Sequence, residues 1–217
     1  MSLKEENFHF LLLSRAFRSV SLSFATVASP LLLYYLGLTP VTIGIILAGA
    51  LTFTAFLSIA LGMLGDYKGY RTSLFISDLI SGIGCTLISV TNSQALASIG
   101  VILAGLSGGA GAPRGAFSPG TTALISTNWR DERERVKRLG LLISVASASS
   151  ILGNSLFAAV SSISNELAYV KYAYLFSAIL LFVSAVLVLR VNEKKRTTKK
   201  ERVLSRRSAS YLVRVVA

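Results

Sequence analysis

Long apolar stretches alternate with short polar ones along most of the chain. Six of these stretches are long enough to cross the hydrocarbon core of a membrane as a helix, which takes about 20 residues. We therefore predict an all-α integral membrane protein, a bundle of six transmembrane helices. The predicted spans are Phe10–Leu36, Val41–Leu64, Thr72–Val90, Leu96–Ser126, Leu139–Ile163 and Tyr172–Val191. Residues 1–191 would then form one transmembrane domain, and residues 192–217 a basic cytoplasmic linker or tail.

Two of the predicted spans have unusual residues. The fourth contains four glycines between positions 105 and 111 and prolines at 113 and 119, so we expect a broken helix. Such breaks are tolerated at membrane depth where protein or a water-filled cavity covers them. The fifth span is rich in small residues, and Ser149 and Gly153 are spaced to allow another helix to approach closely.

Composition supports the membrane class. Hydrophobic residues make up 53% of the chain and charged residues only 15%, whereas a soluble domain carries about 25% charged residues. The net charge of +12 could suggest nucleic-acid binding. The basic residues lie at the ends of apolar runs and in the tail, however, where they orient helices.

The distribution of lysine and arginine predicts the orientation. All of them except Arg114 and Lys171 lie at the amino end, between spans two and three, between spans four and five, or in the tail. Because basic loops stay in the cytoplasm, we predict a multi-pass protein of the cell membrane with both termini cytoplasmic. An even number of spans agrees with this orientation.

A charged stretch, Gly62-Met-Leu-Gly-Asp-Tyr-Lys-Gly-Tyr-Arg71, joins the second and third spans. Its charges cannot stay in lipid, so we expect a tight hairpin at the membrane surface. Gly65 and Gly69 would supply the backbone freedom for the reversal.

The pattern Gly62-x-x-x-Asp66-x-x-Gly69-x-Arg71 resembles the signature between helices 2 and 3 of the major facilitator superfamily of secondary transporters. That family usually has G-x-L-x-D-R-x-G-R-R/K, and this chain has tyrosine at positions 67 and 70, where basic residues are common. The glycine-rich part of the fourth span is similar to the family's R-x-x-x-G-x-G stretch. The arginine of that stretch would fall at Gly105 and is missing here.

The resemblance implies a fold and roles for the hairpin residues. Members have twelve spans in two halves, each half built from two inverted repeats of three helices, with the solute site between the halves. Asp66 would interact with a helix dipole of the other half, and Arg71 would be its ion-pair neighbour. Gly62 and Gly69 would permit close packing and turning. The fifth span lacks the G-P-x-x-G-G pattern of many drug/proton antiporters.

Asp78 and Arg114 are charged residues inside the third and fourth predicted spans. Each needs a partner or water, because an ionised side chain at a helix centre costs about 2.5–3.5 kcal/mol on the insertion scale. Arg114 is a candidate for binding an anionic solute, and Asp78 for carrying a coupled proton. The alternatives are a structural ion pair between them, or an Asp78 that only anchors the hairpin near the interface.

Three further side chains are candidates for the pathway or its entrance. Arg15 and Arg18 share a helix face and would point to the cytoplasmic mouth, where they guide an anion or, more commonly, anchor the helix at the interface. Asn154, in the middle of the fifth span, would line a cavity or form a hydrogen bond between helices.

The function expected from these features is secondary transport of a small solute, with an anion favoured by Arg114, through alternating access. The chain would be a half-length or truncated transporter that needs a second six-helix half, with a proton or ion as a further partner. The alternative is a non-transporting assembly subunit or an inactive fragment. The sequence has no pattern typical of a catalytic, metal or cofactor site, so we predict neither an enzyme nor a cofactor, and no nucleic-acid partner.

Overall fold

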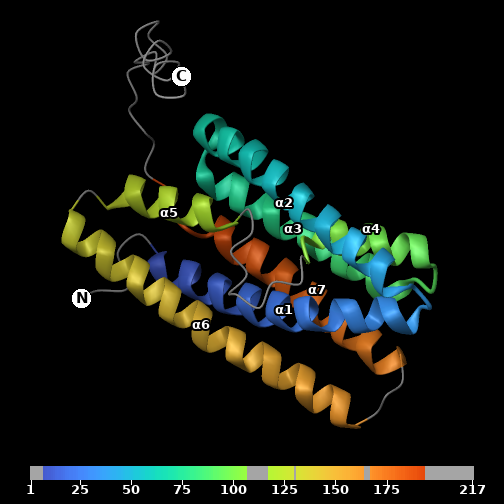
Figure 1. Cartoon of the computed structure of the whole chain (residues 1–217). Helices are drawn as coiled ribbons and strands as arrows, with labels where there is room; N and C mark the ends of the chain where they lie inside the picture. Colours follow the sequence, from blue (N-terminus) through green and yellow to red (C-terminus); the bar gives the residue numbers. More distant parts are fainter. Residues whose placement is uncertain (1–6, 107–116, 130, 164–166, 194–217) are drawn as a thin grey trace, which may run out of the picture.

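The computed structural model describes residues 7–106, 117–129, 131–163 and 167–193, and within these ranges the chain is helical with no strand (Figure 1). Its helices are α1 (Phe8–Tyr35), α2 (Pro40–Lys68), α3 (Tyr70–Val90), α4 (Gln94–Ala104), α5 (Phe117–Asn128), α6 (Glu132–Ile163) and α7 (Leu167–Leu189). Five of them, α1, α2, α3, α6 and α7, are long and apolar enough to cross a membrane. The predicted class, an all-α integral membrane protein, is confirmed.

The predicted fourth span is two helices, α4 and α5, and not one helix of full length. Helix α4 ends where Gly105 adopts the left-handed conformation, with φ of 71°, a conformation that glycine adopts without steric cost. The predicted break is therefore confirmed at its start. The rest of the glycine- and proline-rich stretch, with Arg114, lies outside the described residues.

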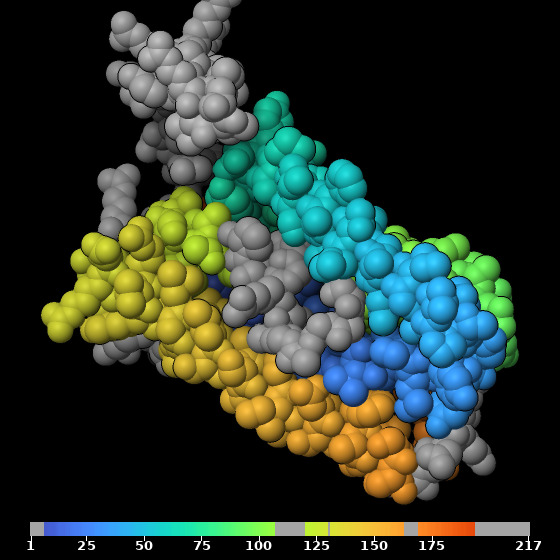
Figure 2. Space-filling view, in the orientation of Figure 1, coloured from blue at the N-terminus to red at the C-terminus, as the bar shows by residue number. Residues whose placement is uncertain are grey.

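Helix α1 lies in the middle of the bundle (Figure 1). It packs against α6 and α7, and α3 packs against α7 and α4. In contrast, α2 and α6 are the least buried of the five long helices. Figure 2 shows them as the two flanks of the visible face, α2 in blue to teal and α6 in yellow to orange.

Serines join α1 to α7 along their length. The Ser14 and Ser184 hydroxyls lie 2.9 Å apart, and Ser21 donates a hydrogen bond to the Ser177 carbonyl at 2.9 Å. In each helix the two serines are seven residues apart, about two turns, so they recur on one face. This polar seam fixes the register of the two antiparallel helices.

Small residues allow α6 to approach α1, as predicted. A side chain at Gly153 would clash with the Val20 carbonyl and lie 3.1 Å from Cβ of Ser23. Ser149, one turn earlier, is buried. The spacing of Ser149 and Gly153 therefore serves close helix packing, and that prediction is confirmed.

At the end of the bundle away from the hairpin, side chains satisfy the carbonyls that helix ends leave free. Gln94 donates to the Leu36 carbonyl at 2.7 Å, next to the end of α1. Lys171 donates to the Thr91 carbonyl and to the Asn92 side chain, just after α3. A cation at a helix carboxyl end is also favoured by the helix dipole, which gives Lys171 a structural role.

Candidate functional site

A buried ion pair between Arg18 of α1 and Asp78 of α3 lies at the centre of the first polar region. The two residues are only 3% and 0% exposed. Ser184 of α7 donates a second hydrogen bond to the carboxylate, with 2.6 Å between Oγ and Oδ2. Three helices thus meet at one aspartate, and both carboxylate oxygens have donors, as a buried charge requires.

Arg15 adds a second positive charge to this region. It lies one turn before Arg18 on α1, is buried, and is close enough to interact electrostatically with both Arg18 and Asp78. The three residues together, which we call the buried charge cluster, carry one more positive than negative charge. The prediction that Arg15 and Arg18 anchor α1 at the membrane interface is wrong, because both side chains are buried in the bundle. Their predicted role toward an anion stays a prediction.

The partner of Asp78 in the described part of the chain is Arg18, and the predicted pairing with Arg114 lies outside the described residues. Nor does Asp78 only anchor the hairpin, because it is fully buried among three helices. Two buried hydroxyls on the same helices, those of Ser19 and Ser77, have no hydrogen-bond partner within the described ranges. Sequence reasoning missed Ser184, although its seven-residue spacing from Ser177 was a signal.

The second polar region is the hairpin between α2 and α3. Helix α2 continues to Lys68, and α3 begins at Tyr70, so Gly69 alone makes the turn, with φ of 100° and ψ of 145°. The predicted role of Gly65 in the turn is wrong. Gly65 is helical and buried, and a Cβ there would lie 2.5 Å from the Tyr70 ring. A Cβ at Gly62 would meet open space, so no contact among the described residues requires a glycine at that position.

Glu193, which follows α7, caps the first turn of α3. Its Oε1 accepts a hydrogen bond from the Tyr70 N–H at 2.8 Å, and Oε2 accepts one from the Arg71 N–H at 3.0 Å. The amino end of a helix has free N–H groups and a positive dipole end, and a carboxylate satisfies both. A Cβ at Gly69 would lie 2.7 Å from Oε2 of Glu193, so glycine is needed here for space as well as for its φ.

The charged side chains of the hairpin have different partners from those that the family pattern implies. Asp66 accepts a hydrogen bond from the Tyr70 hydroxyl, and Arg71 donates to the Leu189 carbonyl at 3.4 Å. No ion pair between Asp66 and Arg71 is present among the described residues, so that expectation is wrong for this conformation. The tyrosine at position 70, where the family commonly has a basic residue, supplies a neutral donor to Asp66.

The segment after α7 is held by other helices as well. The Asn7 side chain, at the start of α1, donates to the Arg190 carbonyl at 3.2 Å. The Asn128 side chain, at the end of α5, donates to the Asn192 carbonyl at 2.7 Å. Together with Glu193, these bonds connect the end of α7 to α1, α3 and α5, which all have an end on this side of the bundle.

The charged connector before the fifth predicted span is the first part of α6 and is helical, as expected. One of its arginines, Arg138, is only 1% exposed. Its guanidinium lies 4.4 Å from the centre of the Trp129 ring and 5.0 Å from that of Phe8, distances typical of cation–π interactions. Glu134 lies 3.7 Å away, one turn earlier. Arg138 therefore connects α6 to the start of α1, through Phe8, and to the end of α5, through Trp129.

Asn154, the remaining candidate, is exposed on α6 and has no hydrogen-bond partner in the described part of the chain. It therefore forms no described bond between helices of this chain. An amide at the middle of a membrane-crossing helix is costly against lipid, which makes a protein or water environment at this face the favourable one.

These features define a multi-pass membrane protein whose helices surround a buried charge cluster. The sequence profile of the Major Facilitator Superfamily matches residues 11–215. The chain therefore belongs to this superfamily of membrane transporters. No curated protein matches the sequence.

The buried pair makes a prediction about stability. Asp78→Asn removes the carboxylate that Arg18 contacts, and Arg18→Gln removes the direct charged partner of Asp78. Breaking a buried ion pair costs about 3–5 kcal/mol. We expect each single variant to melt at a lower temperature in detergent, as measured by size-exclusion chromatography after heating. The double variant should be less destabilised than the sum of the two. Strictly additive losses would contradict an energetic coupling between the two side chains.

The capping contact makes a second prediction. Glu193→Ala should weaken the first turn of α3 by about 0.5–2 kcal/mol, the range for a lost helix cap. Hydrogen–deuterium exchange should then rise in a peptide over residues 68–76 and stay unchanged in a peptide over residues 84–92. Glu193→Gln keeps one acceptor oxygen and should give an intermediate rate. Equal exchange in all three proteins would show that Glu193 does not cap the helix.

Proposed function

We propose that this chain is one half of a secondary transporter that moves a small anionic solute by alternating access. Superfamily membership supports transport, and the excess positive charge of the buried charge cluster is the observation that carries the choice of an anion. Arg15 and Arg18 face one carboxylate, Asp78, so an anion entering this region would be attracted to it. Arg114, predicted inside the fourth span, would add a further positive charge.

In this proposal Arg18, Asp78 and Ser184 each have a role in transport. Arg18 is released from Asp78 when the carboxylate takes up a proton, and it then binds the anionic group of the solute together with Arg114. Ser184 holds Asp78 in place through its 2.6 Å hydrogen bond. Transport of an anion with a proton would thus avoid leaving an unpaired charge in the bundle at any stage.

The exposed flanks of the bundle support a second half as partner. Helices α2 and α6 are the least buried of the long helices, and α6 exposes Asn154. A second six-helix bundle packed against the exposed sides of α2 and α6 would cover Asn154 and close a pathway between the halves. The hairpin residues Gly62, Asp66, Gly69 and Arg71 would meet the second half and stabilise one conformational state.

A non-transporting membrane subunit or an inactive fragment is the second candidate. The observation that favours it is the ion pair between Arg18 and Asp78, which already gives the buried carboxylate a partner among the described residues. A purely structural role would leave solute uptake absent under all conditions, which separates it from the transporter proposal.

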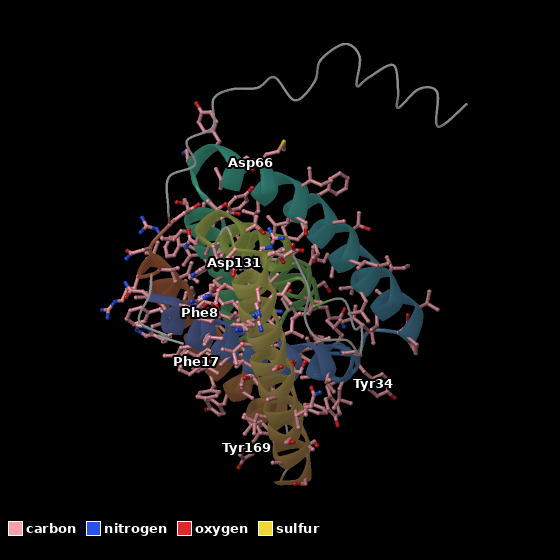
Figure 3. The ribbon with its side chains drawn as sticks, turned by 90° about the vertical axis from the view of Figure 1, so that its left-hand side faces the viewer. Phe8, Phe17, Tyr34, Asp66, Asp131 and Tyr169 are labelled. Carbon is pink, nitrogen blue, oxygen red and sulfur yellow. The ribbon has the colours of Figure 1, made fainter. Side chains whose placement is uncertain are left out.

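We further propose that the protein lies in the cell membrane with the hairpin and both chain ends in the cytoplasm. In Figure 3, Asp66 lies near the top of the molecule, and Tyr34 and Tyr169 lie in its lower part. The basic residues Lys68 and Arg71 adjoin Asp66 in the hairpin, in agreement with the positive-inside rule.

The topology can be tested with single cysteines in a Cys85→Ser background. Lys68→Cys should be protected from a membrane-impermeant maleimide in intact cells and labelled after permeabilisation, and Ser93→Cys should be labelled from outside. Both positions are exposed, so each can react when the reagent reaches it. Labelling of Lys68→Cys in intact cells would overturn the orientation.

The transport proposal can be tested in vesicles with a panel of radiolabelled organic anions, cations and neutral solutes. The chain would be assayed alone and together with the six-span protein that completes it. We expect uptake of an anion that a proton gradient increases, at least a tenfold loss with Arg114→Ala, and loss of the gradient response with Asp78→Asn. Arg133→Gln, which removes an exposed charge from α6, is the matched control and should transport normally. Undiminished anion uptake by Arg114→Ala would rule out its role.

A further inference from the structure

An apolar groove runs along the outer surface of α7. It has a volume of about 520 Å³ and is lined by Ile179, Phe182, Val183, Val186, Leu187 and Arg190. All of these except Arg190 are apolar, and Val183 and Val186 are exposed. In a membrane this surface is covered by lipid or by protein, because water does not reach it.

The length of the groove matches one leaflet of a bilayer. From Ile179 to Arg190 the helix rises about 16 Å at 1.5 Å per residue, and half of the hydrocarbon core measures about 15 Å. Ile179 lies near the middle of α7, and Arg190 directly follows its last residue. The groove therefore reaches from the middle of the membrane to the interface on the hairpin side.

The charge at the interface end of the groove is positive. The Arg190 guanidinium is exposed and lies 5.8 Å from the centre of the Phe10 ring, and no carboxylate of the described residues forms an ion pair with it. The nearby Arg71 side chain is bonded to the Leu189 carbonyl. Glu193 is the acidic residue of this segment, and its two oxygens accept bonds from the Tyr70 and Arg71 N–H groups.

We propose that this groove binds an anionic phospholipid. One acyl chain lies along the apolar side chains from Ile179 to Leu187, and the headgroup phosphate pairs with Arg190. Anionic lipids of the cytoplasmic leaflet are attracted to basic side chains at the membrane surface, and guanidinium groups bind phosphate through paired hydrogen bonds. The site is separate from the buried charge cluster, so it does not depend on which solute is transported.

The test uses the purified chain of residues 1–217 in mild detergent, with equal amounts of phosphatidylglycerol and phosphatidylcholine that have the same acyl chains. Native mass spectrometry counts the lipids retained. We expect a preference for phosphatidylglycerol, and Arg190→Gln should reduce it about fivefold, the effect of one basic residue at an anionic surface. Arg133→Gln removes the same charge from α6 and should leave the preference unchanged.

A second variant tests the acyl-chain part of the site. Val183→Trp fills the groove but keeps Arg190, so it should lower the retention of both lipids. The proposal is overturned if Arg190→Gln keeps the preference of the unmodified protein, or if Arg133→Gln loses it equally. It is also overturned if Val183→Trp retains both lipids as the unmodified protein does, because no acyl chain would then occupy the groove.

Discussion

An arginine and an aspartate inside a bundle surrounded by lipid have lost their water, so each needs the other or another polar partner. Arg18 and Asp78 meet this requirement across α1 and α3, and Ser184 brings α7 to the same carboxylate. Because the three helices share one acceptor, none of them can slide or rotate without breaking a charge-assisted bond. The order of packing in this bundle, with α1 in the middle and α3 against α7, follows from satisfying that carboxylate.

The serine seam extends the same constraint along the helices. Apolar surface alone does not drive helices together in a membrane, since lipid is equally apolar, and packing and hydrogen bonds decide the arrangement. Between α1 and α7 the hydroxyls of Ser14 and Ser21 find partners on α7 only in one register. Between α1 and α6 the absent side chain of Gly153 allows backbone contact. Polar contacts therefore set the register of α1 against α7, and small residues set the distance between α1 and α6.

Features that depend on neighbouring residues could be predicted from the sequence. The existence of the apolar helices follows from runs of apolar residues, and the end of α4 from Gly105, because both are local effects. The partner of Asp78 could not be predicted, since Arg18 lies 60 residues earlier and meets it only through helix packing. The same holds for Glu193, which caps a helix more than 120 residues before it. The sequence predicted a longer turn than the single residue Gly69. The charged residues before Gly69 suit a surface loop as well as the last turn of a helix, and α2 continues through them to Lys68.

The hairpin and the segment after α7 are joined by hydrogen bonds, so they would move together. Glu193 binds the backbone of α3 and not a side chain, so the contact is insensitive to the residue types at positions 70 and 71. Tyr70 gives Asp66 a neutral hydrogen-bond donor where the superfamily commonly has a cation. This bond spans one helical turn across Gly69, while the two oxygens of Glu193 hold the first turn of α3 to the end of α7. The short turn at Gly69 is therefore fixed from both sides, by a side-chain contact from α2 and by backbone contacts from the segment after α7.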